Sequence, residues 1–243
     1  MEAIEVAKGP VLKCYFRDQS VSLYIRCGKE ATDASFFGML GIERESTMRK
    51  GEATRQRIIA EAAPIFNQKG YAGCSMNDLM EATGLEKGGI YRHFANKEEL
   101  AAEAFRFALA QTIKVRTDHL EDVPGAANKL RRVVQLFVEV PSGVAGGCPL
   151  LNTAIDADDG NPELRKLALK GIQDWRTRLA AIVEAGIAAG EIRKKTDPQR
   201  IANAIISTLE GALMISRLER TRSALQDARA TLEIVIRDIS RAE

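Results

Sequence analysis

The chain has 243 residues, of which 45% are hydrophobic, 28% are charged and only 5% are aromatic. This is the mix of an ordinary globular protein, and the formal net charge of +2 excludes histone-like basic chains and acidic disordered tails. Scarce aromatics imply an aliphatic, alanine-rich core, which favours packed helices over a β-sandwich. No apolar run approaches the length of a membrane span and no signal-peptide pattern opens the chain, so we expect a cytoplasmic protein without membrane contact.

The first 47 residues differ in pattern from the rest. The segment from Lys13 to Cys27 has aromatic and β-branched residues and could form a short strand or hairpin. Nothing downstream resembles a sheet that it could join, and an isolated hairpin is marginally stable in water. We therefore expect residues 1–47 to be a poorly ordered extension, with Met48 as a plausible alternative translation start.

From residue 52 onward the apolar pattern is helical. It predicts a first helix from Glu52 to Lys69, which Pro64 should bend and which Gly70 should end as a left-handed cap. Polar N-cap residues, two of them followed by proline, mark the starts of later helices. The sequence predicts an all-α fold of about nine helices, the remainder at 75–84, 86–93, 96–118, 123–140, 150–156, 161–190, 197–219 and 222–241.

The segment SMNDLMEATGLEKGGIYRHF, residues 75–94, has the spacing of a helix-turn-helix. In that motif the first helix crosses the DNA backbone and the second enters the major groove. Leu79, Met80, Leu85, Ile90 and Phe94 are expected to form the small core that sets the angle between the two helices.

The face of the second helix opposite Ile90 has the composition of a DNA-contacting surface. Gly88 and Gly89 lower helix propensity by about 1 kcal/mol each, but they let the backbone approach a phosphate or base closely. Eight basic and five acidic residues between Met48 and Lys97 give this region a modest positive charge. Donors for phosphates or base edges are Lys87, Tyr91, Arg92, His93 and Lys97.

The stretch from Thr54 to Leu100 resembles the DNA-binding domain of tetracycline-repressor (TetR) family regulators, most specifically in KGGIYRHF and NKEEL. The resemblance implies a helix-turn-helix domain at 48–98 and an effector-binding and dimerisation domain at 99–243. It also implies a homodimer through helices 197–219 and 222–241. Carried over by position, the DNA-binding residues are Ser75, Asn77, Lys87, Gly88, Gly89, Tyr91, Arg92, His93 and Lys97.

Two residues depart from the family pattern. Glu86 stands where a small hydroxyl residue is common, and a carboxylate there could repel a nearby phosphate. Pro64 interrupts the first helix and should alter its geometry.

The implied function is a ligand-responsive regulator that binds a pseudo-palindromic operator in double-stranded DNA as a dimer. We expect a repressor released by an unidentified small-molecule effector that binds one conformation preferentially. Candidate pocket residues are Phe105, Phe137, Trp175 and Met214. The apolar stripes expected at the dimer interface are Ile201, Ile205, Leu209, Leu213 and Leu225, Leu232, Val235, Ile236, Ile239, so that charged residues at Leu209 and Leu232 should yield monomers.

Two other functions remain as alternatives, an enzyme built in the helical core and a scaffold that only dimerises. The sequence shows no nucleophile–base pair and no metal-ligand spacing among its four cysteines and two histidines. We therefore expect no catalytic residue, metal or cofactor, and no enzyme. Cys148, in a glycine-rich break, is either a buried thiol or an oxidation sensor.

Overall fold

A computed structural model describes residues 11–15, 22–26, 50–158 and 160–240, which belong to two separate units, Met1–Arg49 and Lys50–Glu243. In the first unit, β1 (Val11–Tyr15) and β2 (Ser22–Arg26) form an antiparallel hairpin in which Val11 pairs with Arg26. The hairpin considered for this segment is therefore present. The expected poor order of the remaining residues up to 47 lies outside the described residues.

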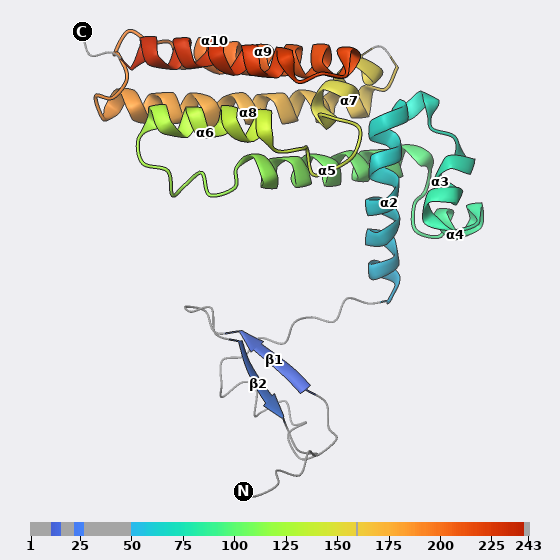
Figure 1. Ribbon diagram of the computed structural model, residues 1–243. Helices are drawn as coiled ribbons and strands as arrows, with labels where there is room; N and C mark the ends of the chain where they lie inside the picture. The colour runs from blue at the N-terminus through green and yellow to red at the C-terminus, as the bar shows by residue number, and fades with distance from the viewer. Residues whose placement is uncertain (1–10, 16–21, 27–49, 159, 241–243) are drawn as a thin grey trace, which may run out of the picture. The chain divides into compact units, whose positions relative to one another are not determined.

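The described part of the second unit is helical, as predicted, and Figure 1 shows its nine helices in sequence colours. Most ends fall within about three residues of the predicted ones. The helices are α2 (Lys50–Gly73), α3 (Met76–Thr83), α4 (Lys87–Tyr91), α5 (Lys97–Arg116), α6 (Ala126–Glu139), α7 (Pro149–Ala157), α8 (Pro162–Ala188), α9 (Pro198–Glu219) and α10 (Ser223–Ile239).

The end of α2 differs from the expected left-handed cap. Gly70 has the positive φ of 74° that was expected, but its ψ of 170° lies outside the left-handed helical region. This backbone turns the Tyr71 N–H toward Asp156 of α7, whose Oδ2 accepts it at 2.6 Å. A Cβ on Gly70 would lie 2.5 Å from Oδ1 of Asp156, so the contact between α2 and α7 also requires glycine.

In the part of the chain that the structure describes, buried side chains form three clusters, and α5 contributes to two of them. The head cluster joins α2, α3 and α4 to one face of α5 through Leu100, Ala104 and Ala108. A second cluster joins the other face of α5, through Ala101 and Phe105, to α7 and α8. Because α5 contributes to both clusters, it connects the packing of α7 and α8 to the packing of the head.

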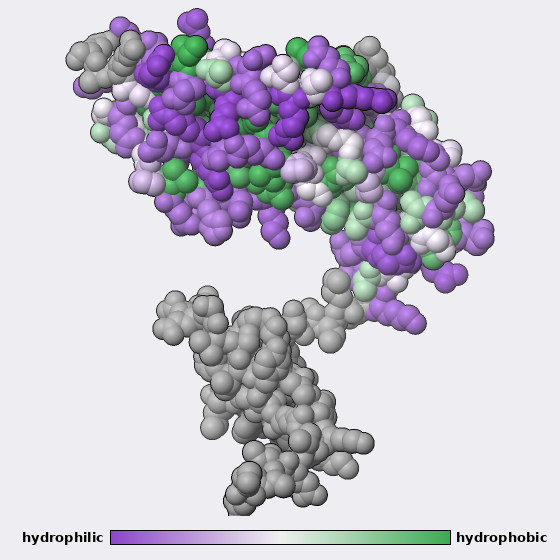
Figure 2. Space-filling model, viewed as in Figure 1, coloured by the Kyte–Doolittle hydropathy of each residue, from purple (hydrophilic) through white to green (hydrophobic). Residues whose placement is uncertain are grey.

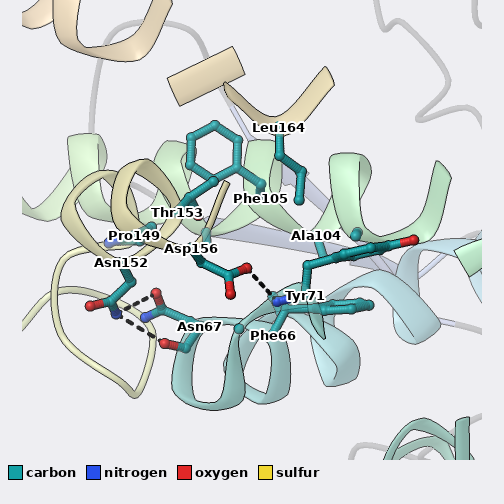
Figure 3. A pocket seen from close by; sticks show the side chains of 14 residues that line it. Phe66, Asn67, Tyr71, Ala104, Phe105, Pro149, Asn152, Thr153, Asp156 and Leu164 are labelled. Atoms are coloured by element: carbon teal, nitrogen blue, oxygen red, sulfur yellow. Dashed lines mark hydrogen bonds between the residues drawn. The ribbon is translucent and has the colours of Figure 1, made fainter. Parts of the chain in front are cut away.

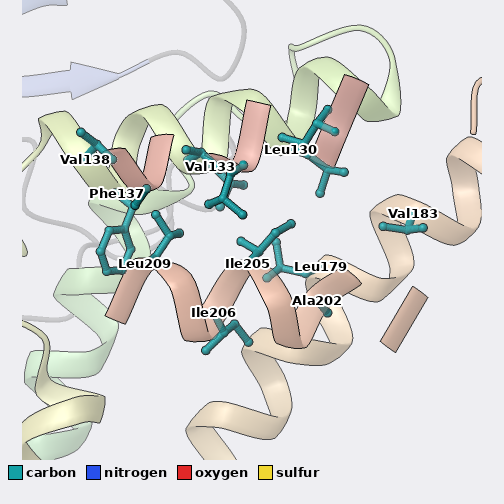
Figure 4. Close-up of a cluster of buried hydrophobic side chains, with 14 of the residues drawn as sticks. Leu130, Val133, Phe137, Val138, Leu179, Val183, Ala202, Ile205, Ile206 and Leu209 are labelled. Carbon is teal, nitrogen blue, oxygen red and sulfur yellow. The ribbon is translucent and has the colours of Figure 1, made fainter. Parts of the chain in front are cut away.

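The third and largest cluster lies between α6, α8, α9 and α10, and Figure 4 shows part of it. It corrects the expected dimer interface. Leu209 and Leu232, chosen as interface residues, are buried here within one protomer, together with Ile205, Leu225, Ile236 and Ile239. A helix that covers its own core presents its most regular apolar stripe inward, so the stripe identifies the core and not the outer face.

The outer faces of α9 and α10 keep large apolar side chains in solvent. Leu218 is 78% exposed and Ile234 is 59% exposed, and Met214 and Ile215 are exposed with them. Polar side chains cover most of the face of the helical body seen in Figure 2, so such apolar groups stand out from the general surface. By length and composition α9 could cross a membrane, but its stripe of Ala202, Ile205 and Leu209 packs in the protein interior, as in a core helix.

Candidate nucleic-acid interface

The first helix of the predicted helix-turn-helix is fixed at both ends. Ser75 and Asp78 form a reciprocal capping box, in which Ser75 Oγ accepts from the Asp78 N–H at 3.2 Å and Asp78 Oδ2 accepts from the Ser75 N–H at 2.8 Å. At the other end Gly84 adopts the left-handed conformation, with φ 63° and ψ 22°. The Ser75 hydroxyl, predicted to contact DNA, is thus used to begin α3.

An ion pair ties α3 to α2. Lys69 Nζ lies 2.6 Å from Asp78 Oδ1. This hydrogen bond, with those from Ser75, lowers the pKa of the Asp78 carboxyl to about 2. Arg57 adds a second link, because its Nη1 donates to the Thr83 carbonyl at the end of α3 at 3.0 Å.

The short helix α4 presents the predicted face to solvent. Ile90 and Phe94 are buried in the head cluster, which leaves Lys87, Gly88 and Arg92 exposed. The predicted core is confirmed, since Leu79 is buried and Met80 and Leu85 pack against the same cluster. Glu86, the N-cap of α4, makes no side-chain capping bond and is exposed on this side of the domain.

The fold itself does not need the two glycines of α4. A Cβ built on Gly88 meets no atom within 4 Å, and one on Gly89 makes only an ordinary contact with Leu85 Cβ at 3.5 Å. Neither glycine has a positive φ. Residues of higher helix propensity would fit here, so the absence of side chains has a use only if another molecule approaches the exposed face closely.

The polar groups on this face are available for a partner. Lys87 and Arg92 form no ion pair with any residue that the structure describes, and Lys87 Nζ lies 5.8 Å from the centroid of the Tyr91 ring. The Tyr91 hydroxyl reaches Met76 Sδ at 3.5 Å, and the side chain is 36% exposed. Asn77 is also exposed. The structure therefore gathers two free cations, a phenol and an amide around a helix with little side-chain bulk.

His93 and Lys97 are placed differently from the other candidates. Both are half-buried. Lys97 Nζ donates to the Tyr71 carbonyl at 2.5 Å and lies 4.4 Å from the centroid of the Tyr71 ring. Lys97 therefore joins α5 to the end of α2, and only the remaining N–H groups of its ammonium could reach a phosphate.

Several residues that hold this surface in place were not found from the sequence. Arg55 of α2 lies 3.3 Å from Glu99 Oε1 and 4.7 Å from the Phe94 ring centroid. Asn67 of α2 accepts two hydrogen bonds from the side-chain amide of Asn152 on α7. Their partners are tens of residues away in sequence, so no local pattern could have identified these pairs. From the sequence, Arg55 is recognised only as one of the basic residues between Met48 and Lys97.

Three of the four candidate effector-pocket residues lie near one another, because Phe105 and Trp175 pack in the same buried cluster and Phe137 contacts Trp175, whereas Met214 is exposed. Phe105 lines a cavity of about 30 Å³ between α2, α5 and α7, shown in Figure 3. Phe137 and Trp175 stack on each other, with ring centroids 5.9 Å apart and an interplanar angle of 9°. Met214 is exposed on the outer face of α9. It follows the inward-facing Leu213 by one residue, which is about 100° around the helix.

The thiols near these clusters are protected. Cys74 and Cys148 are both buried, and burial is the largest cause that raises the pKa of each. For Cys148 the neighbouring Glu210 carboxyl raises the pKa further. A protonated, buried thiol is a poor nucleophile, so this geometry supports the buried-thiol interpretation over an oxidation sensor.

Comparisons with known proteins identify both parts of the helical unit. Residues 58–104 match the family model "Bacterial regulatory proteins, tetR family", and residues 126–232 match "Tetracyclin repressor-like, C-terminal domain". A TetR transcriptional regulator from Chloroflexus aurantiacus is 43% identical, with a TM-score of 0.76, and the match covers 81% of this chain and all of that chain.

Two further relatives are also transcriptional regulators. A TetR-family regulator from Cytophaga hutchinsonii is 38% identical with a TM-score of 0.76, and the match covers 81% of this chain and 99% of that one. The HTH-type transcriptional repressor DhaR of Mycobacterium sp. strain GP1 is 24% identical over 172 residues, 70% of this chain and 86% of its own length.

Proposed function

Since the chain belongs to the TetR family of DNA-binding transcriptional regulators, we propose that it represses transcription as a homodimer bound to a pseudo-palindromic operator, and that a small-molecule effector releases it. The observation that carries this proposal is the exposed face of α4. Gly88 leaves open space there, and Lys87 and Arg92 are unpaired among the described residues. Such a helix fits the major groove with its backbone close to the DNA.

The proposed contacts divide by type. Lys87, Tyr91 and Arg92, together with the backbone at Gly88 and Gly89, would face bases or phosphates from the groove. Asn77 at the start of α3, with the N–H groups of the Ser75 region, would contact the backbone of the same half-site. His93 and Lys97 would add phosphate contacts from the edge of the domain. Glu86 would disfavour any register that brings a phosphate beside it.

The outer faces of α9 and α10 would provide the dimer contact. Leu218 and Ile234 are the most exposed large apolar side chains of these two helices. A two-fold dimer through this surface would place two α4 helices in successive major grooves, roughly 34–36 Å apart. An effector that binds preferentially a form with another spacing would weaken operator binding.

The repressor role is supported by DhaR, a relative that is itself a transcriptional repressor. A cytoplasmic location follows from a function on DNA. The two alternatives have less support. An enzyme would need a reactive group, yet Cys148 is buried and protonated. A protein that only dimerises would gain nothing from the two glycines of α4, since the fold leaves room for side chains at Gly88 and Gly89.

A gel-shift titration tests the proposal. The probe is duplex DNA from upstream of the protein's own gene and from the intergenic regions beside it, with unrelated duplex as competitor. We expect one retarded species that resists competitor and that is lost in the variant Lys87→Ala/Tyr91→Ala. If no such fragment binds in preference to the competitor, or if this variant binds as well as the wild type, the proposal is wrong.

A further inference from the structure

The interior of the helical body contains charged side chains that lack nitrogen or oxygen partners for hydrogen bonds. Arg116, at the end of α5, has its Nε and Nη1 fully buried and unpaired, and both carboxylate oxygens of Glu210 on α9 are in the same condition. Glu210 is only 7% exposed. A buried group that makes no hydrogen bond costs about 1–3 kcal/mol, and more when it is charged. Two such groups of opposite charge in one core therefore require an explanation.

These groups belong to one site, which we call the interior polar cluster and define as Arg116, Cys148 and Glu210. Both Arg116 and Glu210 act electrostatically on the Cys148 thiol at the start of α7, and they also act on each other. Even so, Arg116 and Glu210 are not within ion-pair distance. Elements α5, α7 and α9 thus bring three polar groups together, and of these only the Cys148 thiol and the Glu210 carboxyl interact by a hydrogen bond.

An aromatic pair orients the guanidinium of Arg116. Its Cζ lies 3.5 Å from the centroid of the Phe137 ring, and Phe137 is itself stacked on Trp175. Stacking occupies the flat face of the guanidinium and leaves its N–H edges free, because those hydrogens lie in the plane of the group. Each free N–H of a guanidinium can form a strong, charge-assisted hydrogen bond with a carboxylate oxygen.

The charge balance also favours an anion. Burial is the largest cause that raises the pKa of Glu210, so its carboxyl tends toward the neutral, hydrogen-bond-donating form. Arginine keeps its positive charge at neutral pH even when burial lowers its pKa. The interior polar cluster then has a fixed cation, a thiol, and an acid that burial shifts toward its neutral form.

We propose that the effector of this regulator is a small carboxylate, held by a charge-assisted hydrogen bond from Arg116 and by a hydrogen bond from the carboxyl group of Glu210. The proposal rests on the proposed function and names the chemical class of its ligand. The stacked Phe137 and Trp175 would lie against the apolar part of the same molecule. No covalent step is involved, and the uncharged thiol of Cys148 lines the site without reacting.

The backbone beside the interior polar cluster connects it to the head. Cys148 follows Gly146 and Gly147, whose carbonyl oxygens accept hydrogen bonds from the amides of Asn152 and Asn67 at 2.8 and 3.2 Å. Asn67 belongs to α2 of the DNA-binding head. Because no solvent reaches the unpaired atoms of Arg116 and Glu210, a ligand enters only when the neighbouring segment moves. That movement changes the hydrogen bonds that hold α2.

The test uses the full-length protein and its operator. Linear carboxylates from acetate to octanoate, and benzoate, are titrated at low millimolar concentration, with the matching primary amides and sodium chloride of equal ionic strength as controls. Thermal denaturation and operator affinity are both measured. We expect at least one carboxylate to raise the melting temperature saturably and to weaken operator binding by roughly 5–150-fold. The matching amide and the salt should have no such effect.

Three variants locate the site. Arg116→Gln should lose the carboxylate response, Glu210→Gln should keep it because glutamine is also a neutral donor, and Arg178→Gln, at an exposed arginine of α8, should behave as wild type. If Arg116→Gln is poorly folded, the comparison of carboxylate with amide on the wild-type protein decides the matter alone. Operator binding without any response to the carboxylates, an equal response to the amides, or a response that persists in folded Arg116→Gln would overturn this inference. Absent operator binding would instead contradict the proposed function.

Discussion

Asn152 of α7 holds Asn67 of α2 through a single amide group. Its Nδ2 lies 2.9 Å from both the carbonyl oxygen and the Oδ1 of Asn67, and Figure 3 shows these two bonds beside the Asp156–Tyr71 contact. The Asn67 amide in turn donates to the carbonyls of Ala145 and Gly147. The head is thus joined to the body by polar contacts as well as by the shared helix α5.

The first prediction concerns this junction. Asn152→Ala leaves the Asn67 oxygens without their donor, so we expect the free energy of unfolding to fall by about 1–3 kcal/mol. Operator affinity should fall as well, because the head is less firmly oriented on the body. Denaturant titration and gel shift measure the two effects. Gln173→Ala, at an exposed amide of α8, is the matched control. If the two variants have the same free energy of unfolding and the same operator affinity, the Asn67–Asn152 contact contributes neither to stability nor to the orientation of the head.

The second prediction separates folding from DNA binding at Gly88. Since a Cβ at this position meets no protein atom, Gly88→Ala should not destabilise the fold and should stabilise it by up to about 0.5–1 kcal/mol. The added methyl group lies on the surface that faces DNA, so operator affinity should fall tenfold or more, which is about 1.4 kcal/mol. Thermal denaturation and gel shift on the same sample measure both. If Gly88→Ala binds the operator as tightly as the wild type, DNA does not contact the surface of α4 at Gly88.

The third prediction uses the salt dependence of operator binding. If Lys87 contacts a phosphate, Lys87→Ala should reduce the slope of log affinity against log salt concentration by about 1. If it contacts a base instead, affinity should fall by about 1–3 kcal/mol and base preference should relax at one position of each half-site. Lys166→Ala, at an exposed lysine of α8, should change neither quantity. A Lys87→Ala protein that matches this control would remove Lys87 from the interface.

The fourth prediction replaces the interface expected from the apolar stripes. Leu218→Glu/Ile234→Glu places charges on the exposed faces of α9 and α10, so the protomer should stay folded and sediment as a 26.6 kDa species. Leu209→Glu places a charge in the core and should unfold the body. Sedimentation velocity and circular dichroism distinguish these results. A dimer that survives the double substitution would place the two-fold contact on another surface.

The fifth prediction concerns acid stability of the head. The Lys69 hydrogen bond and the capping box lower the pKa of Asp78 from 3.8 to about 2. A carboxyl with a lowered pKa in the folded state contributes stability that is fully present above pH 3.8 and is lost as the pH falls toward about 2. Carboxyl NMR should show Asp78 titrating near 2 in the wild type and nearer its usual value in Lys69→Met. Titration of the wild-type carboxyl near 3.8 would mean that the ion pair does not form in solution.

Local chemistry explains why the helices were predictable. Asn96, Asn161 and Asp197 each accept a backbone N–H from the first turn of the helix that follows, as their sequence positions predicted. The exposed face of α4 followed in the same way from the inward position of Ile90. In these cases the deciding contacts lie within a few residues, so the sequence carries the whole signal.

The misplaced interface shows where this reasoning stops. Leu209 and Leu218 lie on the same helix and have the same side chain, yet one is buried and the other is 78% exposed. Helix α9 is apolar on two faces, and only the packing of α6, α8 and α10 decides which face is internal. The partners Asp156–Tyr71 and Asn152–Asn67 are separated by 85 residues, so they too depended on the tertiary fold.

Selection of bound sequences from a random duplex pool by the purified protein, followed by sequencing, tests the central claim most directly. The account predicts an enriched two-fold symmetric site whose half-sites are about 10 base pairs apart from centre to centre, as two α4 helices in successive major grooves require. It also predicts that Gly88→Ala, folded as well as the wild type, enriches no such site. An unselective pool with wild-type protein, or the same enriched site with Gly88→Ala, would contradict the role assigned to α4.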